Sequence, residues 1–327
     1  MIKKVKNIVF NKYRYSKIKK VIPNDTYAEV IAKNWVDYDW LEWDESKKLL
    51  RVKNTNIEIT ENNCFFLLSK DSAFKNLVQL QQEAGAKYFQ ENNQLYIQIN
   101  GLTLNIQTTQ EIYTLDEIYL GGFYHFAFNR DFIAIDIGMN VGYSSLYFAI
   151  HPLCKKVFSF EPFKPTYAQG RHNIDNNPAA AVKIQTYNYA LSDKNDTIEI
   201  DYSPSIRGSM SIDYWPDFAN KSVEEVVKEK IVIRDVEEAF TELNLPQDKN
   251  NMVIAKIDCE GAEYAIVDKL LETGRLQHID VIMMEWHLKG TDLLTIPLNK
   301  AGFECFCINQ LGHEGKYGFI YAINKRK

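Results

Sequence analysis

The sequence of 327 residues holds few of the features that mark secreted, fibrous or membrane-spanning proteins. Its five cysteines form no pair or cluster with the spacing of zinc ligands, so free thiols in a reducing compartment are expected. Only 15 glycines and 9 prolines are present, which excludes collagen-like and low-complexity chains. No apolar run approaches the roughly 18 residues of a membrane-spanning helix. We therefore expect a cytoplasmic globular protein, neither disulfide-stabilised nor integral to a membrane.

Positive charge is concentrated at the N-terminus. Residues 1–20 contain no acidic residue and eight basic ones, which are Lys3, Lys4, Lys6, Lys12, Arg14, Lys17, Lys19 and Lys20. Because the formal net charge is −5, removing these eight leaves −13 for residues 21–327. Proteins that bind nucleic acid present a basic face, so we expect no nucleic-acid partner. The basic segment is either a solvated terminus or a contact with an anionic membrane surface.

Residues 21–110 predict a small α+β module. Alternating apolar and polar residues indicate short strands at 49–52, 56–60, 95–99 and 102–106. The Asn100-Gly101 pair between the last two is the strongest short signal for a hairpin, and 71–84 reads as a helix. The aromatic segment 35–43 either fills a small core or stacks on sugar rings. This module is a candidate for recognising a substrate or a partner.

Residues 111–327 predict a doubly wound α/β domain. Apolar strand-like runs lie at 132–137, 156–161, 182–188, 252–258, 281–285, 303–308 and 317–323. Helical patterns lie between most of them, at 143–150, 165–176, 262–272 and 291–301. Strands separated by helices of this length form a parallel sheet. The last two runs are joined by a short glycine-containing turn, so we expect a mostly parallel seven-stranded sheet with an antiparallel hairpin at one edge.

A long insertion, about 192–250, interrupts this pattern. Insertions of this length in compact domains are usually functional lids or substrate loops. The polar stretch 203–211 is the part that we interpret as a lid, and we interpret the charged run after it as helical. Within the lid, Ser209 is a further candidate, and Arg207 either pairs with a phosphate or carboxylate of the substrate or is solvated.

The first strand of the sheet ends in a carboxylate followed by a glycine-containing turn. The turn has the pattern D-x-G-x-N-x-G, formed by Asp136, Gly138, Asn140 and Gly142. Ligands bind outside the carboxyl ends of parallel strands, and glycine lets the backbone approach them. A dinucleotide fingerprint needs glycine where this chain has Asn140 and Tyr143, which disfavours an NAD-dependent oxidoreductase. A cationic ligand without phosphate suits the acidic turn better, and S-adenosylmethionine is the natural candidate.

The second strand also ends in an acid. Glu161 follows Asp136 by 25 residues, and an acid at this position can accept hydrogen bonds from two ribose hydroxyls. Either acid alone could simply cap a turn. The two together favour a nucleoside-type ligand.

Several segments resemble FkbM-type methyltransferases. They are Asp136–Gly142, Glu161-Pro162, Asn188–Ser192, Lys256–Glu263 and Glu285–His287, and Glu117–Tyr124 resembles the helix and turn that precede the domain in this family. The resemblance spans about residues 111–325. It implies a class I, Rossmann-like methyltransferase that uses S-adenosylmethionine and releases S-adenosylhomocysteine, usually an O-methyltransferase of sugars or polyketide-type products.

The resemblance also implies roles for single residues. It implies that five residues bind the cofactor: Asp136, Gly138, Asn140, Gly142 and Glu161. The turn from Asn188 to Ala190 falls where the adenine edge is usually contacted. Met139 stands where the family commonly has alanine, so its bulk needs room in the turn.

Four ionisable groups close the fourth and fifth strands: Asp258, Glu260, Glu285 and His287. Such a group is costly to bury unless it is functional, binds a metal or forms a structural network. A hydroxyl acceptor must lose its proton on attack, so these residues are the candidate general bases, and an imidazole is the natural base at neutral pH. Mg²⁺ at Asp258 and Glu260 is an alternative that no motif requires, and we predict no metal site.

The leading interpretation is O-methylation of a hydroxyl on a sugar, glycan or glycan-lipid, as in polysaccharide biosynthesis. The substrate class rests on analogy. An N-methyltransferase would not need the same base. The alternative from another class is a catalytically inert scaffold that binds a glycan or a partner, but such a protein has no reason to keep acids at four strand ends.

Overall fold

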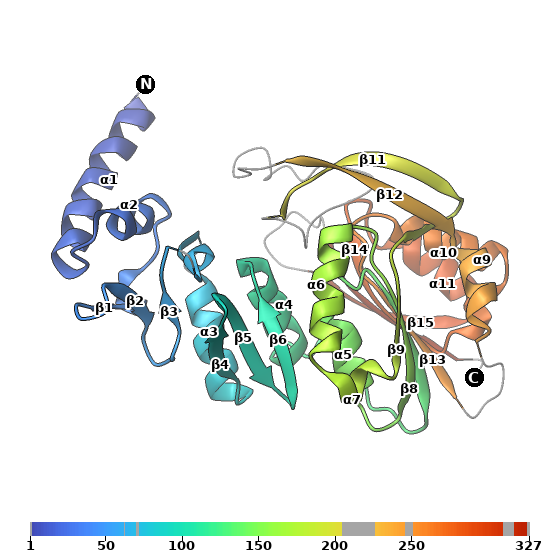
Figure 1. Cartoon of the computed structure of the whole chain (residues 1–327). Coiled ribbons are helices and arrows are strands. Elements are labelled where there is room, and N and C mark those ends of the chain that lie inside the picture. The colour runs from blue at the N-terminus through green and yellow to red at the C-terminus, as the bar shows by residue number, and fades with distance from the viewer. Residues whose placement is uncertain are drawn as a thin grey trace. The chain divides into compact units, whose positions relative to one another are not determined.

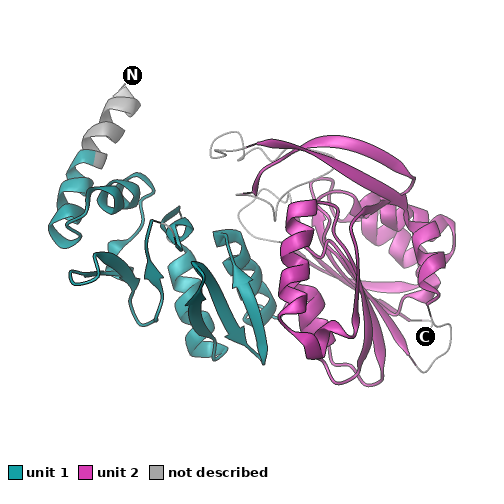
Figure 2. Ribbon diagram, in the orientation of Figure 1, with its two compact units in different colours: residues 1–122 teal, residues 123–327 magenta. Residues whose placement is uncertain are grey.

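The computed structural model describes residues 2–61, 63–69, 72–204, 226–245, 251–309 and 317–325, with side chains from Lys12 onward (Figure 1). The chain forms two compact units, residues 1–122 and residues 123–327 (Figure 2). No helix in the described ranges is both long enough and apolar enough to span a bilayer.

The first unit combines helices with two small antiparallel sheets. Its helices are α1 (Ile2–Val21), α2 (Asp25–Lys33), α3 (Ser72–Glu83) and α4 (Thr109–Tyr119), with short 3-10 turns at Tyr38–Trp40 and Phe65–Ser69. One sheet has the order β1 (Leu41–Asp44), β2 (Leu49–Val52), β3 (Glu58–Ile59). The other has the order β4 (Lys87–Glu91), β5 (Gln94–Ile99), β6 (Leu102–Ile106).

Local sequence explains the boundaries of these elements. The turn between β5 and β6 needs positive φ angles, which Asn100 (48°) and Gly101 (80°) adopt. Helix α4 begins after Thr108, whose hydroxyl oxygen accepts a hydrogen bond from the Glu111 N–H at 3.4 Å. The Glu111 carboxylate in turn accepts the Gln107 N–H at 2.7 Å, so side chains satisfy these two backbone donors at the start of α4.

The second unit is a seven-stranded α/β sheet. Its strands are β7 (Phe132–Ile137), β8 (Cys154–Phe160), β9 (Ile184–Tyr187), β13 (Met252–Ile257), β14 (Val281–His287), β15 (Phe303–Asn309) and β16 (Tyr317–Asn324). The order is β15-β16-β14-β13-β7-β8-β9. In this sheet β16 runs in the opposite direction to the other six strands. The predicted fold class, with its antiparallel edge hairpin, is confirmed.

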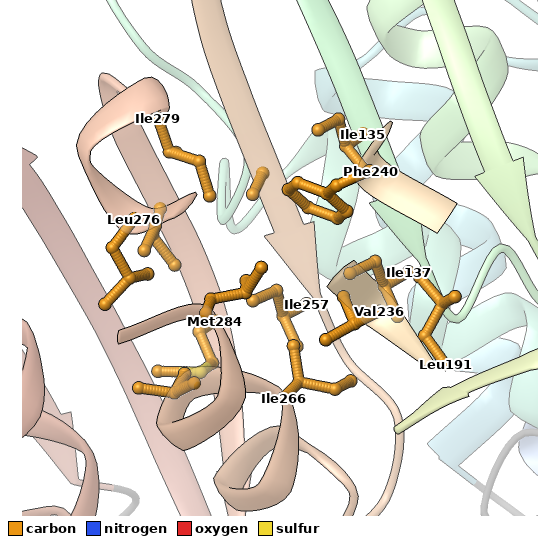
Figure 3. Packing of buried hydrophobic residues seen from close by; sticks show 14 of the residues in the cluster. Ile135, Ile137, Leu191, Val236, Phe240, Ile257, Ile266, Leu276, Ile279 and Met284 are labelled. Carbon is orange, nitrogen blue, oxygen red and sulfur yellow. The ribbon is translucent and has the colours of Figure 1, made fainter. Parts of the chain in front are cut away.

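Helices cover both faces of this sheet (Figure 1). They are α5 (Tyr143–Ala149), α6 (Lys164–Asp175) and α7 (Pro178–Ala181) on one face and α9 (Val236–Leu243), α10 (Glu263–Glu272) and α11 (Asp292–Ala301) on the other, with a 3-10 turn at Arg275–His278. Figure 3 shows Phe240 of α9 beside Ile135 of β7, and Ile266 of α10 beside Ile257 of β13. Each fully buried hydrophobic side chain of this kind contributes about 1.5–3 kcal/mol.

The insertion contains a second sheet, with the order β10 (Ala190–Ser192), β12 (Val227–Asp235), β11 (Asp196–Tyr202). The interpretation of the charged run as wholly helical is therefore wrong, because β12 precedes α9. In β12, Ile231 and Ile233 are buried while Val232 is 45% exposed, which is the period of a strand. The lid candidates Arg207 and Ser209 lie outside the described residues.

Candidate functional site

A pocket opens at the carboxyl ends of β7, β8 and β13, where the strand order reverses. Six of the residues singled out from the sequence line it: Gly138, Asn140, Glu161, Ala190, Asp258 and Glu260. Aromatic and aliphatic side chains complete the wall, among them Phe160, Phe163, Tyr189 and Leu191. The pocket therefore joins acidic groups from two strand ends to an apolar surface.

Close backbone packing shapes the turn after β7. The Gly138 N–H donates to the Phe160 carbonyl at 3.0 Å, and φ of Gly138 is +83°. A Cβ atom at this position would lie 1.7 Å from the carbonyl oxygen of Asp258. Only glycine fits here, so the sequence reason for Gly138 is contact between the turns after β7 and β13.

Met139 is accommodated by a glycine on a neighbouring helix. The Met139 side chain is 1% exposed. A Cβ atom on Gly170 of α6 would lie 2.8 Å from its Cε and 3.0 Å from the Asn140 carbonyl oxygen. The bulk of Met139 is thus absorbed behind the turn, by the space that Gly170 leaves.

Glu161 is the acid on the β8 side of the pocket. It is 5% exposed, and its two carboxylate oxygens accept the N–H groups of Asn140 and Phe163, each at 3.0 Å. Burial raises the pKa of Glu161 to about 7, although these backbone donors counteract the shift. Beside it, the buried Oδ1 of Asn140 has no hydrogen-bond partner among the residues the structure describes. This wall of the pocket thus offers hydrogen-bond acceptors to a ligand.

Three of the predicted cofactor residues lie behind the wall. Asp136 is fully buried and accepts the hydroxyl groups of Ser144 (2.7 Å) and Ser145 (2.6 Å) on α5. The Asn188 amide donates to the carbonyl oxygens of Glu161 (2.9 Å) and Pro162 (3.0 Å). Gly142, with φ +84°, is the residue that caps the start of α5. These contacts position the pocket turns.

Lys256 is a site residue that the sequence analysis missed. Its side chain is 2% exposed and donates to the Gly138 carbonyl oxygen at 2.5 Å. Its Nζ lies 3.3 Å from Asp136 Oδ1 and 3.5 Å from Asp258 Oδ2. Burial alone would lower the pKa of Lys256, but the two carboxylates raise it above its ordinary value. A lysine inside an otherwise apolar strand was the signal that could have identified it.

The four candidate bases converge at the ends of β13 and β14. One donor atom from each of Asp258, Glu260 and His287 lies within 4.8 Å of the others. His287 Nε2 is 3.5 Å from Glu260 and 3.8 Å from Glu285. The strand pairing predicted from the sequence therefore brings these four residues together.

Glu263 ties this cluster to the backbone. It is fully buried and accepts the N–H groups of Gly261 and His287, each at 2.7 Å. Its Oε1 also lies 3.4 Å from Nδ1 of His287. Burial alone would lower the pKa of His287, but the three surrounding glutamates raise it to about 10. The cluster thus keeps the imidazole protonated at neutral pH.

The second unit is a doubly wound α/β domain with its ligand pocket where the strand order reverses. Within that class, the family model described as "Methyltransferase FkbM domain" matches residues 136–304, more than half of the chain. The chain belongs to the FkbM methyltransferase family, which confirms the resemblance drawn from the motifs.

Individual similarities are distant. The chain is 25% identical over 205 residues to the AMB antimetabolite synthetase AmbE of Pseudomonas aeruginosa, a match that covers 61% of this chain and 9% of that protein. A crystal structure of methyltransferase FkbM from Methylobacillus flagellatus KT is similar at 13% identity and a TM-score of 0.39, covering 61% of this chain and 45% of that one. M. jannaschii TYW2 in complex with AdoMet is similar at 12% identity and a TM-score of 0.39, covering 72% and 87%.

Proposed function

We propose that this FkbM-family chain is an S-adenosylmethionine-dependent O-methyltransferase that acts on a hydroxyl of a sugar, glycan or glycan-lipid. The observation that carries the proposal is the composition of one pocket. Glu161 and Asn140 line it from the β7 and β8 ends, and Asp258 and Glu260 line it from the β13 end. A site for the methyl donor and a site for the methyl acceptor can therefore lie next to each other in this pocket.

The residues present suit this cofactor. The Glu161 carboxylate can accept hydrogen bonds from ribose hydroxyls, and the unsatisfied Asn140 Oδ1 can accept an N–H of the cofactor's amino group. Phe160, Phe163 and Leu191 offer an apolar surface for a base ring. When bound, S-adenosylmethionine supplies the methyl group and a sulfur that leaves with the bonding electron pair.

The acceptor hydroxyl must lose its proton as the new oxygen–carbon bond forms. Because the surrounding glutamates keep His287 protonated at neutral pH, we assign the proton to a carboxylate of the cluster: Asp258, Glu260 or Glu285. His287 then holds a positive charge beside Glu260 and Glu285. Exact placement of the acceptor adds further acceleration, since in-line displacement depends on the alignment of three atoms.

The test is calorimetric titration of the full chain with S-adenosylhomocysteine, with NAD as the control ligand. We expect micromolar binding to the wild type, no binding of NAD, and loss of binding in Glu161→Ala. Glu304→Ala, which removes an exposed acid on β15, is the matched control and should bind as the wild type does. Failure of the wild type to bind at millimolar concentrations would contradict the proposal and favour the inert scaffold.

We also propose that α1 contacts an anionic membrane surface. Lys12, Lys17 and Lys20 of this helix are exposed, whereas Arg14 donates to the Val36 carbonyl and Lys19 pairs with Asp25. Exposed lysines near an anionic surface contribute about 1 kcal/mol each. In a sedimentation experiment, the wild type should therefore pellet with phosphatidylserine vesicles. The double variant Lys17→Glu, Lys20→Glu should stay in the supernatant. Equal retention by neutral vesicles would contradict the proposal.

A further inference from the structure

Two strand ends bring one imidazole and two carboxylates together. Asp258 and Glu260 follow β13, and His287 is the last residue of β14, 29 positions after Asp258. Each offers one ligand atom, and these atoms lie within 4.8 Å of one another. We infer that Asp258, Glu260 and His287 bind a divalent metal cation, which holds the acceptor oxygen if the chain is the methyltransferase proposed above.

The orientation of His287 supports a ligand role. Its side chain is more than nine-tenths buried, and Nδ1 has no hydrogen-bond partner among the described residues. Nδ1 faces the fully buried Glu263 at 3.4 Å, while Nε2 faces Glu260 at 3.5 Å and Glu285 at 3.8 Å. The Nε2 distances exceed those of an N–H···O hydrogen bond. A carboxylate behind one imidazole nitrogen is the usual arrangement when the other nitrogen binds a metal.

The charges around the cluster also favour a cation. Asp258 and Glu260 contribute two carboxylates to the cluster, and those of Glu263 and Glu285 lie beside His287. The nearby lysine, Lys256, lies 3.5 Å from Asp258 and is shared with Asp136. A divalent cation would displace the proton from Nε2 of His287 and supply its positive charge in place of that proton.

The geometry needs only a modest contraction. A cation about 2.1 Å from each ligand holds neighbouring donor atoms roughly 3–4 Å apart. The three donor atoms lie within 4.8 Å of one another, so shifts on the order of 1 Å would bring them to that spacing. Carboxylates suit Mn²⁺ and Mg²⁺, whereas an imidazole favours a transition metal, so Mn²⁺ is the probe that fits both kinds of ligand. Because Asp258 and Glu260 line the pocket, coordination positions remain open toward the acceptor.

A cation here would change which residue of the cluster accepts the proton. As a Lewis acid it would polarise the acceptor hydroxyl, which makes its proton easier to remove. The three ligands would be occupied, and the proton would pass to Glu285, which lies beside His287 and is not one of them. The atoms and electrons of the methyl transfer remain as in the metal-free proposal.

The experiment is calorimetric titration of the chelator-treated full chain with MnCl₂, followed by MgCl₂. We expect one saturable Mn²⁺ site in the wild type and binding at least tenfold weaker in His287→Gln. Glu260→Gln, at a more exposed ligand, should weaken binding in the same way if His287→Gln folds poorly. His172→Gln, which removes an exposed histidine on α6, is the matched control and should bind as the wild type does.

Two results would overturn the inference: no saturable binding to the wild type at millimolar Mn²⁺, or equal binding by both ligand variants. Titration with S-adenosylhomocysteine on the same samples separates this inference from the proposed function. Cofactor binding without Mn²⁺ binding would leave the methyltransferase proposal intact and reject the metal. Mn²⁺ binding without cofactor binding would do the reverse.

Discussion

The two acidic sides of the pocket differ in what surrounds their carboxylates. Glu161 stands in an apolar wall and is held by backbone N–H groups, and burial raises its pKa to about 7. At the ends of β13 and β14, several carboxylates crowd one imidazole, and their charges raise the pKa of His287 to about 10. The pKa of Glu161 therefore lies near neutral pH, whereas that of His287 lies well above it. In the proposed function, the same residue type would therefore bind the cofactor on one side and accept a proton on the other.

The largest effect is expected on the β13–β14 side. Changing Asp258, Glu260 and Glu285 singly to their amides should lower kcat by about 10²–10⁴-fold in at least one variant, because the base is lost. Affinity for S-adenosylhomocysteine should change less than about threefold in that variant. Steady-state kinetics and calorimetry measure the two quantities, with Glu304→Gln as the control. Near-wild-type kcat in all three variants would indicate an acceptor, such as an amine, that needs no base.

Gly138 joins the two sides, so its replacement should damage both. Gly138→Ala should lower the free energy of unfolding by about 3 kcal/mol or more, because its Cβ would collide with the Asp258 carbonyl at positive φ. Thermal unfolding measures the loss. Gly274→Ala also has positive φ, but the nearest atom is a flexible side chain at 3.5 Å, so it should cost about 1 kcal/mol. Equal costs would contradict the proposed collision.

The β8 side should respond to pH. The ionised Glu161 is the better acceptor for ribose hydroxyls, and its pKa is about 7 in the free protein. Affinity for S-adenosylhomocysteine should therefore fall as the pH drops below 7, by up to about tenfold per pH unit. Calorimetry between pH 5.5 and about pH 8 measures the slope. Glu161→Gln should bind weakly with no such slope, and an unchanged slope would assign the titration to another group.

The smallest effect concerns the space behind the turn after β7. Gly170→Ala should destabilise the protein by about 1–3 kcal/mol, because the added methyl group overlaps the Met139 side chain. Met139→Ala in the same chain should restore part of that loss by clearing the contact. A double-mutant cycle of unfolding free energies measures the coupling, and strictly additive losses would show that the two residues do not compete for space.

The sequence predicted the central sheet well because its strands are continuous apolar runs with polar ends. It predicted the pocket turns because Asp136, Gly138 and Glu161 stand at those ends. It did not predict β12, whose alternating charges and β-branched residues resemble a charged helix when burial is unknown. Glu263 was missed as a contact of His287 because their partnership depends on how β13 and β14 pair, through Ile257 and Met284.

Glu263 also fixes the backbone at the end of β14 without depending on the side chain at position 287. It holds position 287 through the main-chain N–H, so the end of β14 is fixed whatever side chain that position carries. A substitution at 287 or 285 would change reactivity while this main-chain anchor stays in place. Glu161 and Asn140, which would bind the cofactor in the proposed function, lie at the ends of other strands. If the proposed function holds, side chains at positions 285 and 287 could therefore be exchanged to alter the acceptor without moving the end of β14.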